Sequence, residues 1–398
     1  MRLYRLMLAG LLSASLTANL ATLWVNLDRM AAGYGDFVIF YTGAEIVNDG
    51  RVAELFKVET QQAYQRKFDV PQFEWPLPFN HAPYELAIFL PLARLSYPVA
   101  HAVWSAFNVV LLLAIAFWLS PHLEPGYRLL FTALTAAFFP TMEALRMGQD
   151  SILSTALLVA CFAALKRGRD AAAGVLLALG LYKPQLVLPF AGVFLVQRRW
   201  KTVAAFGVTG AVLAAVSLAA VGWQGALDLL SILRSMHDYS YIVNPRNMPN
   251  IRGLLEVALP APALSGGTLV AASSLALYGG CLFFCRGTRD AAEPGFDLRF
   301  ALAIVTTTLV TYHLYSHDLM PLVIALGIVS GEALAGRMTA PAARFGFLAL
   351  LPIFYVPLVP SLLVRDRVFG WGAAPLLLLY GLLVSELAAR ERPLPRPR

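Results

Sequence analysis

Charged residues are scarce in this chain of 398 residues, where Asp, Glu, Lys and Arg together make up 14% and apolar residues make up 58%. The mean hydropathy is +0.65. A soluble domain ordinarily has about one quarter of its residues charged, and it cannot bury so much apolar surface. The low charge therefore excludes an ordinary soluble enzyme and predicts a protein whose solvent is lipid.

Motifs of several common enzyme classes are also missing. The chain has no Gly-x-x-x-x-Gly-Lys-Ser/Thr loop for nucleotide phosphates, no Gly-x-Gly-x-x-Gly before a helix and no His-Glu-x-x-His for zinc. The basic residues are spread over many loop ends, which excludes nucleic-acid binding as the reason for the net charge of +7. We therefore expect neither nucleotide hydrolysis, nor zinc proteolysis, nor a nucleic-acid partner.

Cysteine is rare, and its three positions, Cys161, Cys281 and Cys285, all fall within or beside apolar segments. A disulfide has little reason to form there. Cys281 and Cys285 lie one helical turn apart, but a metal site needs more than two thiols without a nearby histidine. We therefore expect all three to be small core residues.

Apolar segments near spanning length, which is about 20 helical residues, are abundant. The predicted helices are residues 6–26, 99–119, 128–145, 150–165, 171–183, 185–197, 202–222, 267–285, 299–314, 318–335, 345–363 and 371–388. The short pair that meets at Lys183-Pro184 fits either two spans or one re-entrant element, because proline removes a helix donor. We expect an all-α polytopic membrane protein with about twelve transmembrane helices, within a range of roughly ten to thirteen.

The distribution of basic residues predicts the orientation. Alternate connections are rich in Lys and Arg if the N-terminus is cytoplasmic. The first apolar segment lacks a small-x-small cleavage site, so we expect an anchoring helix and not a signal peptide. The protein is then expected in a bacterial inner membrane, with both termini cytoplasmic and two long connections, residues 27–98 and 223–266, on the outer face.

The first outer connection is rich in aromatic residues, and we expect its helices to lie along the membrane interface. Its apolar residues 86–95 are too few to span and fit an interfacial or re-entrant helix. Residues 1–389 are predicted to form a single transmembrane domain, and residues 390–398, with three prolines, a disordered cytoplasmic tail.

Seven short motifs occur in an order that is typical of one family. They are Gly35-Asp36-Phe37 with Tyr41, Gly50 with Leu55-Phe56, Ala82-Pro83-Tyr84, Trp104 with Asn108, Met147-Gly148-Gln149-Asp150-Ser151-Ile152-Leu153, Gly174 with Lys183-Pro184-Gln185, and Arg198-Arg199-Trp200. Over residues 30–325 the chain thus resembles glycosyltransferase family 87, which comprises polyprenyl-phosphate-mannose-dependent mannosyltransferase-like proteins of the C-type membrane glycosyltransferase fold. Residues after Ala325 show little of this pattern.

The resemblance implies a donor in which one sugar, mannose in the family, is linked to a long isoprenoid phosphate. The acceptor is then a hydroxyl group of a glycolipid or glycan that arrives from the outer side. An inverting displacement at the anomeric carbon needs a base for this hydroxyl and cations for the leaving phosphate. We expect no metal and no other cofactor, because the outer loop lacks an Asp-x-Asp pair and Arg, Lys and His can neutralise one phosphate.

Asp36 is the predicted catalytic base, because it matches the acidic residue of the family's first outer loop. The competing explanation for a single acid after an anchoring helix is a helix cap or a solvated side chain. Three other residues of this loop, Tyr41, Glu45 and His81, are weaker candidates for substrate contacts.

Four cationic side chains at the outer boundary are predicted to bind the donor phosphate: Arg146, Lys183, Arg252 and His317. Ionisable groups at such depth are costly, which favours a functional role. Lys183 matches the Lys-Pro turn of the family, with snorkelling to the interface as the alternative. His317 matches the family's late aromatic-rich histidine element, whereas His313 is better explained as a core histidine. Arg252 is explained equally well as an ordinary loop residue.

Gln149 and Asn250 are predicted to contact substrate. Gln149 precedes Asp150 at a helix start, where an aspartate can also cap the helix. Asn250 lies in a segment that partly resembles the family's Asn-containing segment, although Ile251 stands where the family has a small polar residue.

A transporter or flippase of a sugar or lipid-linked sugar is the competing function. Such proteins usually have internal repeats, and broken helices with buried ionisable groups. No convincing repeat relates the two halves of this sequence, and an outer loop of roughly 60 residues suits a catalytic surface better than a pore. The sequence therefore favours a membrane hexosyltransferase with a periplasmic or extracellular active face.

Overall fold

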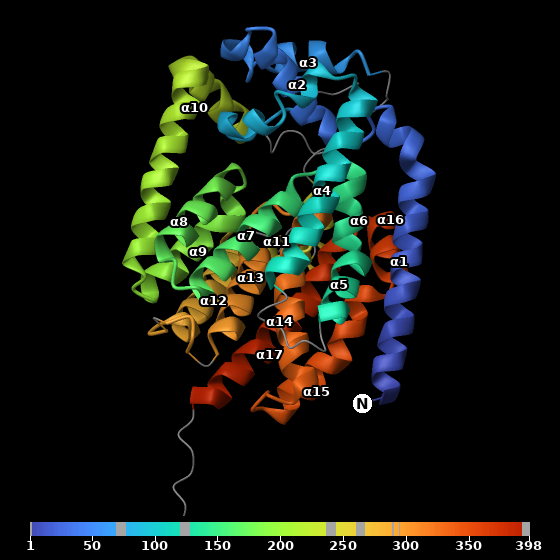
Figure 1. Ribbon diagram of the computed structural model, residues 1–398, viewed down its shortest axis with the longest axis vertical. Helices are drawn as coiled ribbons and strands as arrows, with labels where there is room; N and C mark the ends of the chain where they lie inside the picture. Colours follow the sequence, from blue (N-terminus) through green and yellow to red (C-terminus); the bar gives the residue numbers. More distant parts are fainter. Residues whose placement is uncertain are drawn as a thin grey trace, which may run out of the picture.

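The structure is a computed structural model that describes residues 2–68, 77–119, 128–235, 244–259, 267–288, 290–293 and 295–391. All regular elements in these ranges are helices (Figure 1). Within these described ranges, six helical segments are long and apolar enough to cross a membrane. They are α1 (Arg2–Ala31), α4 (Tyr97–Leu119), α10 (Trp200–Ser235), α12 (Thr268–Cys285), η10 with α14 (Ser316–Ala335) and η12 with α17 (Phe369–Glu391).

Shorter helices fill the space between the long ones. They are α5 (Arg128–Ala137), α6 (Phe139–Met147), α7 (Ser151–Lys166), α8 (Asp170–Leu179), α9 (Pro184–Val196), α13 (Phe296–Val310), α15 (Pro341–Leu350) and α16 (Leu358–Arg365). Nearly every side chain of α13 and α14 (Leu322–Ala335) is buried in the main apolar core. A helix enclosed by protein in this way need not match the bilayer in length. The chain is therefore an all-helical integral membrane protein.

The first long connection forms a separate layer at one end of the bundle (Figure 1). Its elements are α2 (Phe37–Asn48), η1 (Val52–Glu54), α3 (Val58–Gln65), η3 (Pro83–Ile88) and η4 (Leu92–Arg94). The core of this layer is aromatic, with the rings of Phe40 and Phe89 stacked at 4.8 Å and Phe37 stacked on Trp104 of α4 at 6.4 Å. Such aromatic pairs add about 0.5–1.5 kcal/mol beyond their burial. The prediction that this loop forms helices is confirmed.

Both described chain ends lie at the other end of the bundle (Figure 1). Helix α1 begins there and runs to the layer formed by the first connection, and α17 (Ala373–Glu391) ends there. The second connection contributes η8 (Pro245–Asn247) and α11 (Ile251–Ala258). The two ends thus share one face of the molecule, as the distribution of basic residues predicts.

Several predicted spans are broken or have other bounds. Segment 128–145 forms two helices, because Phe138 is extended and Pro140 starts α6. Segment 345–363 is divided by η11 (Leu351–Tyr355), whose second residue is Pro352. Segment 202–222 continues to Ser235 across a kink at Gly222, where φ is 71° and ψ is 177°. Among the described residues, six of the about twelve predicted segments form helices long enough to span, and the other segments form shorter helices.

Three smaller predictions concern the junction at Lys183, the cysteines and the C-terminal tail. The pair of segments that meets at Lys183 forms α8 and α9, joined by η7 (Gly180–Tyr182). The three cysteines are buried and free, as predicted. Helix α17 includes Arg390 and Glu391, so the predicted disordered tail began two residues too early. Residues 392–398 of that tail lie outside the described residues.

Candidate active site

Two loops that are distant in the sequence meet beneath the first-connection layer. The backbone N–H of Asp36 donates to the carbonyl oxygen of Met147 at 2.8 Å. Both loops need glycine here. Gly35 has a φ of 139°, and an added Cβ would lie 3.0 Å from that same carbonyl; Gly148 has a φ of 67°, and its Cβ would lie 2.5 Å from Phe37. The motif glycines therefore permit the approach that brings Asp36 to the start of α7.

Asp36 occupies the N-cap position of α2, yet its side chain makes no capping hydrogen bond. Its Oδ2 atom instead accepts a hydrogen bond from Nε2 of Gln149 at 2.6 Å. Asp36 is partly exposed, and Gln149 is the single hydrogen-bond donor to its side chain among the described residues. The helix-cap explanation is thus wrong for this carboxylate, which keeps one oxygen available for another donor.

Lys183 extends this network from the position between η7 and α9. Its Nζ lies 3.3 Å from Oε1 of Gln149 and 3.0 Å from the hydroxyl of Ser151. It also forms ion pairs with Oδ1 of Asp150 at 2.6 Å and Oδ1 of Asp318 at 2.7 Å. Lys183 is 3% exposed, so it does not snorkel to the interface. Because two carboxylates already compensate its ammonium, Lys183 is not presented to a ligand as a phosphate-binding residue would be.

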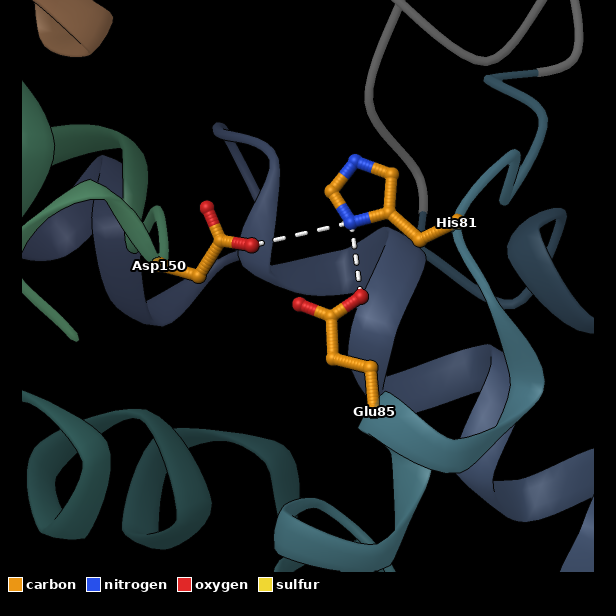
Figure 2. Close-up of side chains that lie close together, drawn as sticks. All are labelled: His81, Glu85 and Asp150. Carbon is orange, nitrogen blue, oxygen red and sulfur yellow. Dashed lines mark hydrogen bonds and ion pairs between the residues drawn. The ribbon is translucent and has the colours of Figure 1, made fainter. Parts of the chain in front are cut away.

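Asp150 connects Lys183 to a second group of buried ionisable side chains (Figure 2). Nδ1 of His81 lies 2.6 Å from Oε2 of Glu85 and 3.6 Å from Oδ2 of Asp150. Glu85 is 1% exposed and Asp150 is fully buried, and the Asp150 side chain does not cap α7. Burial raises the pKa of Glu85 to about 8, although the neighbouring His81 opposes this rise.

Tyr315 directly precedes η10 (Ser316–Leu319) and lies near the site. Burial raises the pKa of Tyr315 to about 12; the charges of Asp36 and Asp318 add to this rise, and Arg252 opposes it. The guanidinium of Arg252 lies 4.0 Å from the centre of the Tyr312 ring. Within the described part of the chain, no carboxylate forms an ion pair with Arg252. The negative charge of Asp36 and the positive charge of Arg252 therefore both act on the phenol of Tyr315, with opposite effects on its pKa.

The other predicted cations lie near Tyr315 or near Asp36. Nε2 of His317 lies 3.5 Å from Oδ2 of Asp318, and its ring centre lies 6.2 Å from that of Tyr315. His313 is partly exposed and packs edge-on against Tyr315 at 5.0 Å. Arg146 pairs with Glu143 at 2.9 Å, and the charge of Asp36 also acts on it. The structure thus brings His317, Arg252 and Arg146 to the neighbourhood of Asp36 or Tyr315.

Three of the weaker candidates are used elsewhere. Tyr41 is buried in the aromatic layer and donates to the carbonyl of Leu95 at 2.7 Å. Glu45 pairs with Lys67. Asn250 is fully buried and caps α11: its Oδ1 accepts from the N–H of Gly253 at 2.9 Å and its Nδ2 donates to the carbonyl of Thr311 at 2.6 Å. None of these contacts joins the Asp36 network, and the geometry of Asn250 leaves no exposed atom for a substrate.

Glu85, Ser151 and Asp318 were not predicted as members of the network, and Asp150 was predicted only as a possible helix cap. Glu85 stands four residues after His81, a spacing that places two side chains side by side along a helical segment. Asp318 follows His317 directly. Both signals were present in the sequence, but neither shows that the carboxylates turn inward to Lys183 and His81.

An apolar groove of about 290 Å³ borders the same region. One wall comes from α10, with Leu213, Ser217 and Val221, and the other includes Pro83 and Tyr84 of η3. The groove-lining residues 82–84 lie in the sequence between His81 and Glu85. The groove therefore runs beside the buried ionisable side chains.

Comparison with known protein families shows that residues 79–311 match Glycosyltransferase family 87. Comparisons with curated proteins and with solved structures found no significant match. The matched range contains His81, Gln149, Lys183 and Arg252, whereas Asp36 lies 43 residues before its start and His317 lies six residues after its end. This match covers more than half of the chain and favours a glycosyltransferase over a transporter. The chain belongs to glycosyltransferase family 87, a family of membrane glycosyltransferases.

Proposed function

We propose that the protein transfers one sugar from a polyprenyl-phosphate-linked donor to an acceptor hydroxyl, with inversion at the anomeric carbon and with Asp36 as the general base. The observation that carries this proposal is the state of Asp36, a partly exposed carboxylate whose Oδ2 is anchored by Gln149. The second oxygen can accept the proton of the acceptor hydroxyl as that oxygen attacks. Positioned bases of this kind contribute about 10²- to 10⁴-fold to a rate.

The leaving phosphate requires positive charge, and Arg252 supports this role best. It is partly exposed and forms no ion pair within the described residues, so its guanidinium is available to phosphate oxygens. His317 and Arg146 are the proposed additional donors. Lys183 takes a different part in the proposal: it holds Gln149, which in turn holds Asp36. Lys183 is then a positioning residue.

The isoprenoid chain of the donor needs an apolar surface, and the groove between α10 and η3 offers one next to the site. Burial of each CH₂ group contributes about 0.8 kcal/mol to such binding. We propose mannose as the sugar, because the family resemblance implies it, and a glycolipid or glycan as the acceptor. We propose a bacterial inner membrane as the location, and the distribution of basic residues supports an active face on its outer side.

A donor assay in membranes tests this function. Membranes with the wild-type protein or Asp36→Asn are incubated with labelled polyprenyl-phosphate-mannose, and consumption of the donor is measured. We expect Asp36→Asn to lower the rate by about 10²- to 10⁴-fold. Asp49→Asn is the matched control, because Asp49 lies in the same layer and accepts a hydrogen bond from Tyr64.

Two results would contradict the proposal in different ways. Equal donor consumption by the wild type and Asp36→Asn removes Asp36 as the base. If neither protein consumes this donor while both are folded and inserted, the polyprenyl-phosphate donor class is wrong.

A further inference from the structure

Three side chains converge on one small volume beside the Asp36 network. His81, Glu85 and Asp150 each direct one possible metal ligand atom to it, and these atoms all lie within 4.8 Å of one another (Figure 2). His81 and Glu85 belong to the first connection, and Asp150 precedes α7. The group therefore joins two segments of the chain that are distant in sequence.

Each of the two carboxylates has an oxygen that receives no hydrogen bond from a described donor. Asp150 directs Oδ1 to Lys183 at 2.6 Å and Oδ2 to His81 at 3.6 Å, so its two oxygens face two different partners. Oε1 of Glu85 receives no hydrogen bond from any donor among the described residues, although Glu85 is 1% exposed. Buried carboxylate oxygens are ordinarily satisfied. This oxygen therefore has room for one partner, either a proton that it shares with Asp150 or a cation.

The charge balance allows a cation at this position. With Glu85 deprotonated and His81 neutral, the states in which these side chains bind a metal, the carboxylates of Glu85, Asp150 and Asp318 share one ammonium, that of Lys183. Buried charges persist when they are paired or coordinate a metal. A divalent cation on the side of Asp150 that faces away from Lys183 would balance the two remaining negative charges.

We propose that His81, Glu85 and Asp150 bind a divalent transition-metal cation. One imidazole nitrogen and two carboxylate oxygens form a donor set that suits Zn²⁺ or Mn²⁺. Ligand atoms of a tetrahedral zinc site lie about 3.4 Å apart, given bonds of about 2.1 Å. The His81–Asp150 distance of 3.6 Å already fits this value, and the His81–Glu85 distance of 2.6 Å lengthens when the ion enters between them.

This site differs from the metal chemistry that the sequence analysis considered. The outer loop lacks an Asp-x-Asp pair, and its sequence therefore predicted no metal. The ligands proposed here come from two segments, the first connection and the residue before α7. The ion would fasten the η3 segment to the start of α7, and Asp150 would connect it to Lys183. The proposal concerns binding and does not depend on the identity of the sugar donor.

Metal binding is measured on the purified full-length protein, without an activity assay. The protein is stripped with EDTA, loaded with Zn²⁺ or Mn²⁺, desalted and analysed by inductively coupled plasma mass spectrometry. We expect about one ion per chain for the wild type, and at least about tenfold weaker binding for Glu85→Gln and His81→Asn, since loss of an outer-shell partner already costs that much. Glu54→Gln is the matched control, because Glu54 lies in the same layer and pairs with Arg51.

Two further measurements keep the test decisive if a variant folds poorly. X-ray absorption of the zinc-loaded wild type should show nitrogen and oxygen ligands at about 2.0–2.2 Å and no sulfur. Added Zn²⁺ should raise the Tm of the stripped wild type and of Glu54→Gln, but not that of Glu85→Gln. A zinc–sulfur distance would place the ion at Cys281 and Cys285 and overturn the proposal.

Absence of bound metal in the wild type would also overturn it, and a proton shared by the carboxyl groups of Glu85 and Asp150 would then explain the cluster. Equal binding by Glu85→Gln would do the same. A protein that binds the ion at this site and consumes no polyprenyl-phosphate donor leaves the metal site standing and contradicts the proposed function. The converse result contradicts the metal site alone.

Discussion

Two neighbouring regions of this protein differ in how far their charged side chains are buried and paired. The buried ionic cluster, which consists of His81, Glu85, Asp150, Lys183 and Asp318, is almost fully enclosed, and its charges lie against one another. The open edge consists of Asp36, Arg146 and Arg252, and it is partly exposed. Among the described residues, Asp36 has one ionic or hydrogen-bonding side-chain partner, Gln149, and Arg146 has one, Glu143. Arg252 has none and donates only to a backbone carbonyl.

The difference separates structural from chemical roles. In the buried ionic cluster, removal of one charge leaves its partners uncompensated in a medium of low polarity, so the first consequence is loss of stability. At the open edge, water can solvate a residue whose partner is lost, so the first consequence is loss of ligand binding or catalysis. Gln149 lies between the two regions and donates to Asp36 while it accepts from Lys183.

The largest effect on stability is expected for Lys183→Met. This change removes the ammonium that compensates Asp150 and Asp318, and breaking a buried ion pair costs about 3–5 kcal/mol. Thermal unfolding in detergent measures the effect. The matched control is Lys67→Met, which removes the exposed partner of Glu45 and should cost less than about 1 kcal/mol. Equal Tm values for the two variants would show that the cluster does not stabilise the fold.

A smaller effect, on binding and not on stability, is expected for Arg252→Ala. Loss of hydrogen bonds from a charged donor costs about 1.5–3 kcal/mol, which corresponds to a rise of about 10- to 100-fold in KM for the donor. The Tm should stay unchanged because Arg252 is partly exposed. Arg246→Ala is the control, since Arg246 donates to the carbonyl of Glu256 in the same segment. An unchanged KM for Arg252→Ala would remove this residue from the phosphate site.

The smallest effect is expected for Glu45→Gln. The sequence offered Glu45 as a possible substrate contact, but the structure pairs it with Lys67 in the first-connection layer. A partly exposed ion pair contributes about 0–1 kcal/mol, so donor consumption should stay within about twofold of the wild type. A loss comparable to that of Asp36→Asn would extend the open edge to α2 and weaken the contrast between the two regions.

The helices could be predicted from the sequence better than their continuity. Apolar length and flanking charge located the segments that became α1, α4, α12 and α17, because lipid requires such lengths. The same criteria could not show that Phe138 interrupts one segment or that a helix crosses Gly222 in another. A proline or glycine leaves both outcomes open, and packing against neighbouring helices decides between them.

The site could be predicted in part. Motif order selected Asp36, Gln149 and Lys183, and these three side chains do form one hydrogen-bonded chain. The motif order also predicted that Lys183 binds the donor phosphate, and it did not identify Asp318 as the ion-pair partner of Lys183. Contacts across 113 or 135 residues of sequence depend on how the helices pack, and no local spacing encodes them.

By itself, the sequence determined that lipid is the solvent of this chain, which segments are helical and which loops carry the ionisable residues. These properties follow from composition and local spacing, because apolar burial and backbone hydrogen bonding act along the chain. Only the tertiary structure decided which of those ionisable residues are compensated and which remain available. Electrostatic free energy depends on distance and burial, so the same type of side chain became a buried partner of Lys183 in Asp150 and an open carboxylate in Asp36.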